Sequence, residues 1–354
     1  MTPFRVIDTG VREGRAQIAF DQALIELHTE GKVPDTIRFL RFPPTALIGR
    51  HQAIGQELKL DYCRENGIGT VRRITGGGAI YLDEGQLGWE LVFSRKNLSL
   101  GGLEDYSRAI CEALAAGLSD RFQIDARFRP RNDIEVEGRK LGGAGGFFDG
   151  DTLIYQGTVL VDMDPARMVA CLNVPAAKLQ KRDLDSAAQR VVTLKDLLDG
   201  ETPPMADVMG AVLEGFSSRL GLALERAEPS RQEEALALRH FEGEIGTDDF
   251  VYEIDEPGGN EVREGSCTGP GGTVAAYLRL DGPRKSRIRE ALITGDFFIT
   301  PPRLIYDLEA SLRGLPVAEA GESVERFFAE HQPQFLTIAP TDFRAAIEAA
   351  LAKA

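Results

Sequence analysis

A glycine loop that follows two arginines is the segment of this sequence best suited to bind an anion. Residues 71–81 read Val-Arg-Arg-Ile-Thr-Gly-Gly-Gly-Ala-Ile-Tyr. Because glycine has no Cβ, the triplet at 76–78 lets backbone N–H groups approach a phosphate or carboxylate closely. Arg72 and Arg73 add positive charge, and Thr75 adds a hydroxyl. The pattern predicts an anion-binding loop, although a tight turn or bulge between strands carries the same glycine signature.

A second candidate segment places a lysine beside another glycine cluster. Residues 131–146 read Arg-Asn-Asp-Ile-Glu-Val-Glu-Gly-Arg-Lys-Leu-Gly-Gly-Ala-Gly-Gly. Glu137-Gly138 fits the two-residue turn of a β-hairpin, with residues 132–136 as the first strand. Lys140 then lies on the return strand, where the glycines allow a phosphate to come close. A solvated lysine on an exposed hairpin has the same pattern, so both interpretations stay open at this point.

Three ordered motifs in this sequence resemble those of the lipoate–protein ligases. They are residues 72–81, residues 132–144 with Asn-Asp and Gly-Arg-Lys-Leu-Gly-Gly-Ala, and residues 156–160 with Gln-Gly-Thr-Val-Leu. The block at 38–52, Arg-Phe-Leu-Arg-Phe-Pro-Pro-Thr-Ala-Leu-Ile-Gly-Arg-His-Gln, is similar to the first conserved block of that family. The resemblance covers most of the chain, and an ordered set of motifs is more specific than a glycine triplet alone.

This resemblance implies an ATP-dependent lipoate–protein ligase that uses Mg²⁺. The carboxylate of lipoate would attack the α-phosphate of ATP, which gives lipoyl-AMP and pyrophosphate. The amine of an acceptor lysine would then displace AMP. Both steps build negative charge on oxygen, which fixed cations and N–H donors stabilise. The implied acceptors are apo lipoyl domains of 2-oxo acid dehydrogenase acyltransferases, the glycine-cleavage H protein, or a lipoate-binding protein of sulfur oxidation.

The resemblance also implies roles for the matched residues. Lys140 would bridge the carboxylate and α-phosphate oxygens with its compact ammonium group. Asp133 would act in catalysis, either by binding the nucleotide or Mg²⁺ or by accepting hydrogen bonds from the incoming lysine. A strand cap at Asp133 and a turn residue at Asn132 are the alternatives. The expected contacts to substrate or nucleotide are Arg73, Thr75, Gly76, Gly77, Gly78, Ala79, Asn132, Gly142, Gly143, Ala144, Gln156, Gly157 and Thr158.

The sequence departs from the family pattern at two positions. Many ligases have His-Asp where this chain has Leu82-Asp83, and many have His where this chain has Gln156. Glutamine donates and accepts hydrogen bonds, but unlike histidine it does not take up and release a proton near neutral pH. We therefore expect the acyl or acceptor specificity to differ from that of the commonest members.

Two alternative functions remain open: acyl transfer from a carrier protein, and binding of lipoyl carriers without catalysis. Octanoyl or lipoyl transfer from a carrier protein needs a cysteine thiolate. In segment 171–175 a proline, Pro175, occupies the expected nucleophile position, and Cys171 lies four residues earlier on a predicted helix. A non-catalytic module that binds lipoyl carriers would keep the same motif residues, although retention of Lys140 argues against it. The arginine-glycine loop that is typical of biotin ligases is not found in this sequence, which argues against biotin ligation. Cys267 has no neighbouring base in the sequence that would make it a nucleophile.

The elements that would position these motifs form an α+β pattern. Apolar spacing predicts amphipathic helices over 16–30 and 103–118, with further helices over 58–66, 165–172, 194–198 and 205–220. Strands are predicted over 36–42, 71–74, 79–82, 89–94, 127–129, 134–136, 140–141, 152–155 and 157–161. We expect one mixed or antiparallel sheet flanked by helices, as in the class II biotin and lipoyl synthetases.

A smaller α+β domain is expected at the C-terminal end. Residues 225–260 are acidic and rich in turn formers, which predicts a connector that contains a helix over 232–241. The glycine-rich stretch 265–272 predicts a flexible turn. Strands over 273–280 and 287–293 and helices over 300–312, 322–331 and 341–353 then follow, and Ile-Thr-Gly-Asp-Phe-Phe at 293–298 resembles the ligase accessory domain. The predicted division is a catalytic domain at 1–250 and an accessory domain at 251–354.

Composition excludes several other classes of protein. The 354 residues carry 41 Lys and Arg against 55 Asp and Glu, a net charge of −14 that disfavours nonspecific binding to nucleic acid or anionic membranes. No apolar run reaches the length of a membrane span, and the N-terminal residues lack a signal-peptide pattern, so we expect a cytoplasmic protein. Four cysteines and four histidines are scattered, which predicts neither a zinc site nor a disulfide framework.

Overall fold

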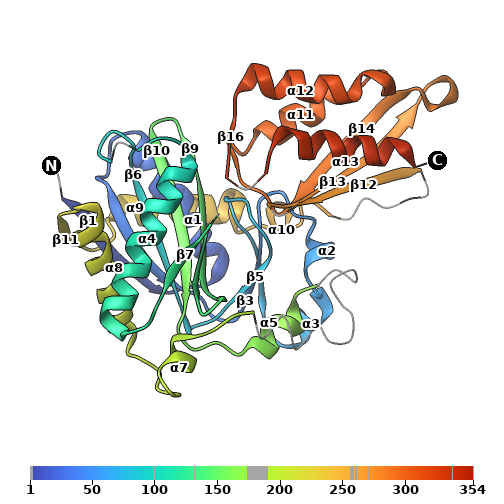
Figure 1. The fold of residues 1–354 in the computed structure, drawn as a ribbon. Helices are drawn as coiled ribbons and strands as arrows, with labels where there is room; N and C mark the ends of the chain where they lie inside the picture. The colour runs from blue at the N-terminus through green and yellow to red at the C-terminus, as the bar shows by residue number, and fades with distance from the viewer. Residues whose placement is uncertain are drawn as a thin grey trace.

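The computed structural model describes residues 3–98, 100–130, 132–173, 190–255, 259, 261–269, 271–336 and 338–353. Within these residues, eight strands form one mixed sheet in the order β11-β1-β2-β6-β10-β9-β8-β7 (Figure 1). β1 pairs in parallel with β11 and β2, and the other neighbours are antiparallel. The strands are β1 (Phe4–Val11), β2 (Thr36–Arg41), β6 (Gln86–Ser94), β7 (Arg127–Arg129), β8 (Asp133–Val136), β9 (Arg139–Asp149), β10 (Thr152–Leu160) and β11 (Leu224–Arg226).

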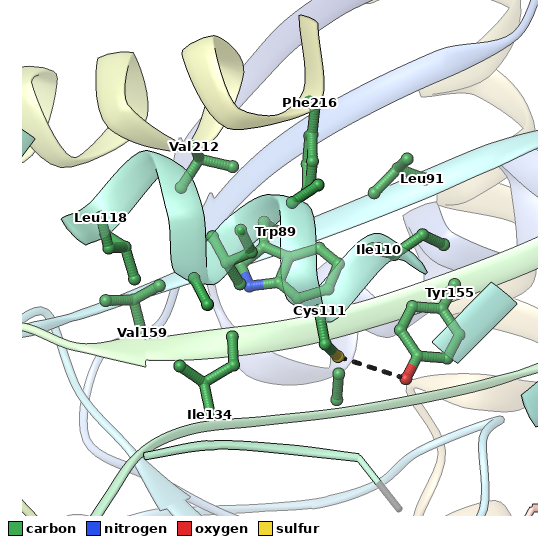
Figure 2. Packing of buried hydrophobic residues seen from close by; sticks show 14 of the residues in the cluster. Trp89, Leu91, Ile110, Cys111, Leu118, Ile134, Tyr155, Val159, Val212 and Phe216 are labelled. Carbon is green, nitrogen blue, oxygen red and sulfur yellow. Dashed lines mark hydrogen bonds between the residues drawn. The ribbon is translucent and has the colours of Figure 1, made fainter. Parts of the chain in front are cut away.

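Helices α4 (Leu103–Phe122) and α8 (Met205–Leu220) cover one face of this sheet. Trp89 on β6 is fully buried at the centre of the resulting core (Figure 2). Its ring lies 5.7 Å from that of Phe216 on α8 in an edge-on arrangement, a geometry that aromatic pairs favour. Apolar residues alternate along β6 on this face because successive strand residues point to opposite sides.

Helix α1 (Gly14–Thr29) lies on the opposite face, between the large sheet and a small sheet. The small sheet has the order β4-β3-β5, with β3 (Thr45–Ile48), β4 (Gly69–Arg72) and β5 (Ile80–Leu82). Short helices flank it: α2 (Ile54–Glu57), α3 (Leu60–Glu65) and α5 (Pro165–Cys171). Helix α7 (Leu194–Leu197) instead joins the core that α4 and α8 form on the large sheet. Residues of both sheets border one cavity.

The prediction of a connector over residues 225–260 is wrong for most of its length. This segment contains the edge of β11, α9 (Arg231–His240), η2 (Phe241–Ile245) and α10 (Asp248–Val251). Leu236, Ile245 and Phe250 belong to the same buried core as α1. Most of the acidic and turn-forming residues lie on the exposed side, although Glu233 is buried and pairs with Arg5, so composition alone hid the packed face.

The C-terminal unit has a core of its own, built from residues 274–350. Strands β12 (Val262–Gly269), β13 (Gly272–Asp281) and β14 (Arg287–Gly295) form an antiparallel sheet, and α11 (Leu304–Leu312), α12 (Ala320–His331) and α13 (Pro340–Ala352) pack on it (Figure 1). Short turns η3 (Pro283–Lys285) and η4 (Val317–Glu319) and the strand pair β15 (Ile299–Thr300) and β16 (Gln334–Phe335) complete the unit.

Within the glycine-rich stretch, residues 265–269 belong to β12 and Gly272 begins β13, so these residues are paired strand and not the flexible turn that composition predicts. A Cβ on Gly265 would lie 2.0 Å from the backbone nitrogen of Ala350, so glycine allows α13 to pack directly on β12. Within the described residues, no helix combines the length and the apolar character that crossing a membrane requires.

Candidate active site

The fifteen residues to which the sequence analysis assigns catalysis or contact with substrate and nucleotide all border one cavity of about 560 Å³. The cavity lies between the glycine loop, strands β9 and β10, and the C-terminal unit. Its volume is in the range of sites for small molecules and cofactors. The bordering residues from the sequence prediction are Arg73, Thr75, Gly76, Gly77, Gly78, Ala79, Asn132, Asp133, Lys140, Gly142, Gly143, Ala144, Gln156, Gly157 and Thr158.

Arg73 shapes the glycine loop from within. Its Nη2 donates to the carbonyl oxygens of Gly76 at 3.1 Å and Gly78 at 2.9 Å. Gly77 has a φ of 93°, a backbone conformation that residues with a Cβ rarely adopt. Burial lowers the pKa of Arg73 to about 10, so the guanidinium stays charged at neutral pH. The loop therefore lines the cavity around a buried cation.

Arg72 does not contribute its charge to the cavity, contrary to the sequence-based expectation. Its guanidinium is fully buried and donates to backbone carbonyls, among them those of Gln52 at 2.7 Å and Val251 at 3.0 Å. Ile254 accepts a further bond at 3.2 Å. Arg72 ends β4 and Arg73 follows it, and neighbouring side chains of an extended chain point to opposite sides, so only Arg73 borders the cavity.

Lys140 forms an ion pair with Asp133 across the predicted hairpin. Glu137 and Gly138 have φ values of 52° and 78°, as a two-residue type I′ turn requires. The Lys140 Nζ atom lies 2.8 Å from Asp133 Oδ1, and Arg129 Nη2 lies 2.5 Å from Asp133 Oδ2. Burial acts to raise the pKa of Asp133, but Lys140 and Arg129 outweigh it and hold this pKa below its usual range. The pair places a charged ammonium at the edge of the cavity.

The same contacts bear on the expected Mg²⁺ role of Asp133. Both carboxylate oxygens already face cationic partners. Across the described parts of the chain, no group of three or more His, Cys, Asp or Glu side chains is placed to hold a metal. This donor set suits an ammonium partner better than Mg²⁺, and the metal role of Asp133 stays a prediction.

Asn132 and Gln156 use their amide groups within the protein. Asn132 Nδ2 donates to the Ala144 carbonyl at 2.5 Å, which ties the start of β8 to β9. Gln156 Nε2 donates to the Thr75 hydroxyl at 2.8 Å, which joins β10 to the glycine loop. Gln156 thus has a positioning contact at the place where many ligases carry a histidine.

None of the four cysteines borders the cavity. Contact with Cys63 and burial both raise the pKa of the Cys171 thiol, and Val174 and Pro175 lie outside the described residues. Burial raises the pKa of Cys111 to about 12. A thiolate nucleophile is therefore missing from the lining of this cavity.

Comparison with known proteins identifies the family. Residues 13–217, more than half of the chain, match the model of the lipoyl protein ligase A/B catalytic domain. The chain belongs to the lipoyl protein ligase A/B family. This result confirms the resemblance that the three motifs carry, and it places the chain in the biotin and lipoate ligase superfamily.

Members of the lipoyl protein ligase A/B family with different reactions are similar to this chain. An octanoyltransferase LipM of Kyrpidia tusciae is 30% identical over 261 residues, which are 67% of this chain and 94% of the relative. A solved structure of a bi-partite lipoate protein ligase and its E2 lipoyl domain from Thermoplasma acidophilum is 26% identical, covers 73% of this chain and 99% of that chain, and has a TM-score of 0.65. A solved structure of a lipoate-protein ligase A bound with ATP is 26% identical to this chain and has a TM-score of 0.63. The match covers 72% of this chain and 100% of that chain. The fold class expected from the sequence is confirmed.

Sequence reasoning missed part of the wall of this lipoyl ligase-family cavity. Apolar residues from α1, β2, β3, β5 and the connection after β2 border it: Ile18, Leu40, Phe42, Leu47, Ile80 and Leu82. Asp21 on α1 also borders it. An acidic residue within the buried stripe of an amphipathic helix was the available signal for Asp21.

The C-terminal unit supplies a further wall. Asp296 and Phe298 border the cavity, together with the tip of the β12–β13 hairpin. The Phe297 carbonyl accepts a hydrogen bond from Gly77 N at 3.0 Å, and His51 stacks on the Phe297 ring at 5.2 Å. The motif at 293–298 was visible in the sequence, but its contact with the glycine loop joins residues more than 200 positions apart.

Proposed function

We propose that this protein is an ATP-dependent lipoate–protein ligase that attaches lipoate to a lysine of a lipoyl domain. The observation that carries this proposal is the composition of the cavity wall, which includes the Lys140 ammonium and the glycine loop but no cysteine sulfur. Adenylate chemistry needs fixed positive charge, whereas carrier-to-protein acyl transfer needs a thiolate. The ATP-bound ligase relative supports nucleotide binding.

Each group in the cavity would have a separate task. The lipoate carboxylate oxygen attacks the α-phosphorus, and pyrophosphate leaves. Lys140 stabilises charge that develops between the carboxylate and the α-phosphate, while Asp133 holds its ammonium in place. The glycine loop donates N–H groups to the acyl or phosphate oxygens. The acceptor amine then attacks the acyl carbon, and AMP leaves.

The C-terminal unit belongs to the proposed ligase site. The LipM relative and the ATP-bound ligase both match over nearly their whole lengths, which correspond to 67% and 72% of this chain. The remainder includes the C-terminal unit, whose Asp296 and Phe298 border the cavity. We propose the division into a catalytic domain, 1–250, and an accessory domain, 251–354, with the accessory domain as part of the ligase site.

The acceptor is proposed to be an apo lipoyl domain in the cytoplasm. The Thermoplasma ligase structure, which is described with its E2 lipoyl domain, supports this class of partner. A 2-oxo acid dehydrogenase acyltransferase, the glycine-cleavage H protein and a sulfur-oxidation lipoate-binding protein are the candidates. Parallel reactions with the three apo proteins would rank them by rate.

Intact-mass spectrometry of an apo lipoyl domain tests the proposal. Incubation with the protein, lipoate and Mg-ATP is expected to add one lipoyl group, and Lys140→Ala is expected to lower the rate by about 100-fold or more because a transition-state cation is lost. Lys195→Ala is the matched control, since Lys195 pairs with Asp162 at 3.0 Å outside this cavity. It should keep the wild-type rate.

The competing functions give different masses. If the lipoyl domain gains an octanoyl group from an octanoyl carrier without ATP, the protein is a transferase and not a ligase. No gain from either donor, with lipoyl-domain binding retained, would favour the non-catalytic module.

A further inference from the structure

His51 joins the N-terminal part of the chain to the C-terminal unit through both its backbone and its ring. It lies in the loop between β3 and α2, and its carbonyl oxygen accepts a hydrogen bond from Gly295 N at 3.0 Å. Its imidazole stacks on the Phe297 ring, with 5.2 Å between the centroids and 16° between the planes. The Tyr306 ring lies 6.1 Å away at an angle of 57°. The histidine side chain therefore packs against two rings of the C-terminal unit.

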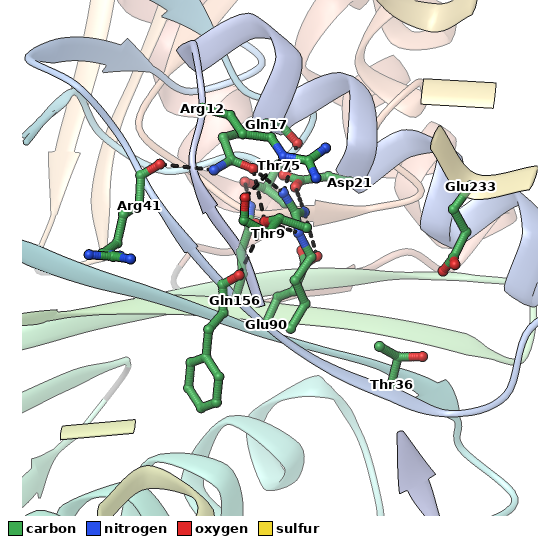
Figure 3. A network of polar contacts seen from close by, with 12 residues as sticks. Thr9, Arg12, Gln17, Asp21, Thr36, Arg41, Thr75, Glu90, Gln156 and Glu233 are labelled. Atoms are coloured by element: carbon green, nitrogen blue, oxygen red, sulfur yellow. Dashed lines mark hydrogen bonds and ion pairs between the residues drawn. The ribbon is translucent and has the colours of Figure 1, made fainter. Parts of the chain in front are cut away.

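The glycine loop beside this contact is held in place by the rest of the N-terminal part. Gln156 Nε2 on β10 donates to the Thr75 hydroxyl at 2.8 Å (Figure 3). Arg50 N, in the loop that carries His51, donates to the Thr75 carbonyl oxygen at 2.9 Å. If the contact with the C-terminal unit opened, the C-terminal segment would therefore move and the glycine loop would stay in place.

That C-terminal segment, residues 295–298, forms one wall of the cavity. Gly77 N donates to the Phe297 carbonyl oxygen at 3.0 Å, and a Cβ on Gly77 would lie 2.6 Å from Cζ of Phe298. Asp296 and Phe298 border the cavity. We call the contacts of His51 and Gly77 with this segment the junction. The position of the wall depends on the junction.

Both ring nitrogens of His51 are buried without a hydrogen-bond partner among the described residues. The residue is 1% exposed. Burial of unpaired polar atoms is unfavourable, and a phenylalanine here could stack on Phe297 without that penalty. Proton uptake in the closed junction would be more unfavourable still, because it would bury a cation that has no partner. The closed junction therefore requires the neutral ring.

The charged groups around the ring strengthen this requirement. Burial, together with the positive charges of Arg50 and Arg72, lowers the pKa of His51 from 6.5 to about 3. Glu253 also lies nearby, but it is paired with Arg50 at 2.6 Å. If residues 295–298 move away, water reaches the imidazole and its pKa returns toward the ordinary value of about 6.5.

The titratable groups of α11 do not weaken the junction in acid. Burial raises the pKa of Tyr306 to about 12, so its hydroxyl stays protonated below pH 8. Burial raises the pKa of Glu309 to about 7, so acid neutralises a buried charge there and stabilises the C-terminal unit. Asp296 in the wall itself accepts a hydrogen bond from Thr273 N. A junction that weakens in acid would therefore do so through His51.

We propose that His51 is a positioning residue whose neutral ring holds the wall at residues 295–298 on the glycine loop, and that proton uptake by this ring releases the wall. The proton comes from solvent and binds one ring nitrogen. Between pH 6.5 and 3 the released state binds more protons than the closed state, so closure weakens as the pH falls through 6.5. The inference depends on the geometry of the junction and not on the reaction proposed above.

Hydrogen exchange of the full-length protein, followed by mass spectrometry, measures the junction through the amides of Gly77 and Gly295. In wild type, their protection, corrected for intrinsic exchange, should fall about tenfold from pH 8 to pH 5.5, because each pH unit below 6.5 lowers the closure constant about tenfold. His51→Phe keeps a stacking ring that does not titrate, so protection should not fall. His331→Phe is the matched control: His331 is exposed, stacks on Phe327 and should leave the wild-type response unchanged.

Equal protection at the two pH values in wild type would overturn the inference, as would the same fall in His51→Phe or its loss in His331→Phe. If His51→Phe does not fold, proton NMR of the wild-type histidines between pH 5.5 and 8 decides. One of the four rings should stay neutral throughout while the two amides lose protection, and titration of all four rings would overturn the inference. Neither measurement uses lipoate, ATP or an acceptor, so a failure of the ligase proposal appears separately, as missing lipoyl mass gain.

Discussion

Arg72 and Arg73 are adjacent in sequence, yet one guanidinium holds the protein together and the other faces the ligand space. Arg72 donates hydrogen bonds to carbonyls within residues 49–52 and 250–254. It therefore joins the segment after β3 to the segment before the C-terminal unit. Arg73 binds the glycine loop itself. Basic charge at a motif is therefore a poor guide to which residue touches a ligand.

Arg72→Met should destabilise the protein by about 3 kcal/mol, because several buried carbonyls lose their only charged donor. The lining of the cavity is unchanged in this variant, so activity of the folded fraction should stay near the wild-type level. Urea unfolding measures the free energy. Arg64→Met is the control, since Arg64 is 75% exposed beside Asp61 and should change stability by less than about 0.5 kcal/mol. An Arg72 variant as stable as this control would contradict the structural role.

At the scale of single elements, two glycines of β9 make room for two different side chains. A Cβ on Gly143 would lie 2.5 Å from Lys140 Nζ, the end of a flexible side chain. A Cβ on Gly145 would lie 2.1 Å from Cε1 of Phe298, a ring packed into the core. Glycine at 143 leaves space for the ion pair between Lys140 and Asp133. Glycine at 145 leaves space for Phe298 of the C-terminal unit.

Gly143→Ala and Gly145→Ala are expected to fail in different ways. Gly143→Ala should lower the ligation rate about tenfold or more, with stability changed by less than about 1 kcal/mol, because only the Lys140 ammonium is displaced. Gly145→Ala should cost about 1–3 kcal/mol of stability, since the packed ring resists displacement. Rates and urea midpoints of both variants check this. Gly210→Ala in α8, where the new Cβ meets nothing within 4 Å, should stabilise slightly. Identical effects at 143 and 145 would contradict this division.

Local signals carried most of the element predictions. The hairpin at Glu137-Gly138 and the helix from Leu103 depend on turn chemistry and apolar spacing, which neighbouring residues determine. The packing of α9 on α1 and the hairpin at 265–272 depend on contacts with distant segments, so composition was misleading there. The site followed the same rule. The motif residues gathered at one cavity as expected, whereas Asp21 and Phe298 required the tertiary structure.

At the scale of the whole molecule, a buried carboxyl group makes stability depend on pH. Glu309 on α11 is 8% exposed, and its Oε1 accepts a hydrogen bond from Ile293 N. Burial raises the pKa of Glu309 from 4.5 to about 7. Between these values the folded protein binds more protons at this group than the unfolded chain does. Raising the pH from 4.5 to 7 therefore removes stability.

Glu309→Gln should abolish this loss, because the amide oxygen can accept the same hydrogen bond without ionising. At pH 8 the variant should be more stable than wild type by about 1–3 kcal/mol, and at pH 4.5 the two should be nearly equal. Thermal melting across this range is the measurement. Glu322→Gln, at an exposed position on α12, should follow the wild-type curve. A constant offset between wild type and Glu309→Gln at every pH would rule out ionisation as the cause.

The contact between Gly77 and Phe297 has a consequence for how the protein is made in the cell. A ribosome releases the glycine loop long before it synthesises the segment that packs on it. Until the C-terminal unit folds, Phe298 and Asp296 do not cover Gly145 and this side of the cavity. Under the proposed function, newly made protein would therefore gain a complete lipoate site only once the C-terminal unit has folded.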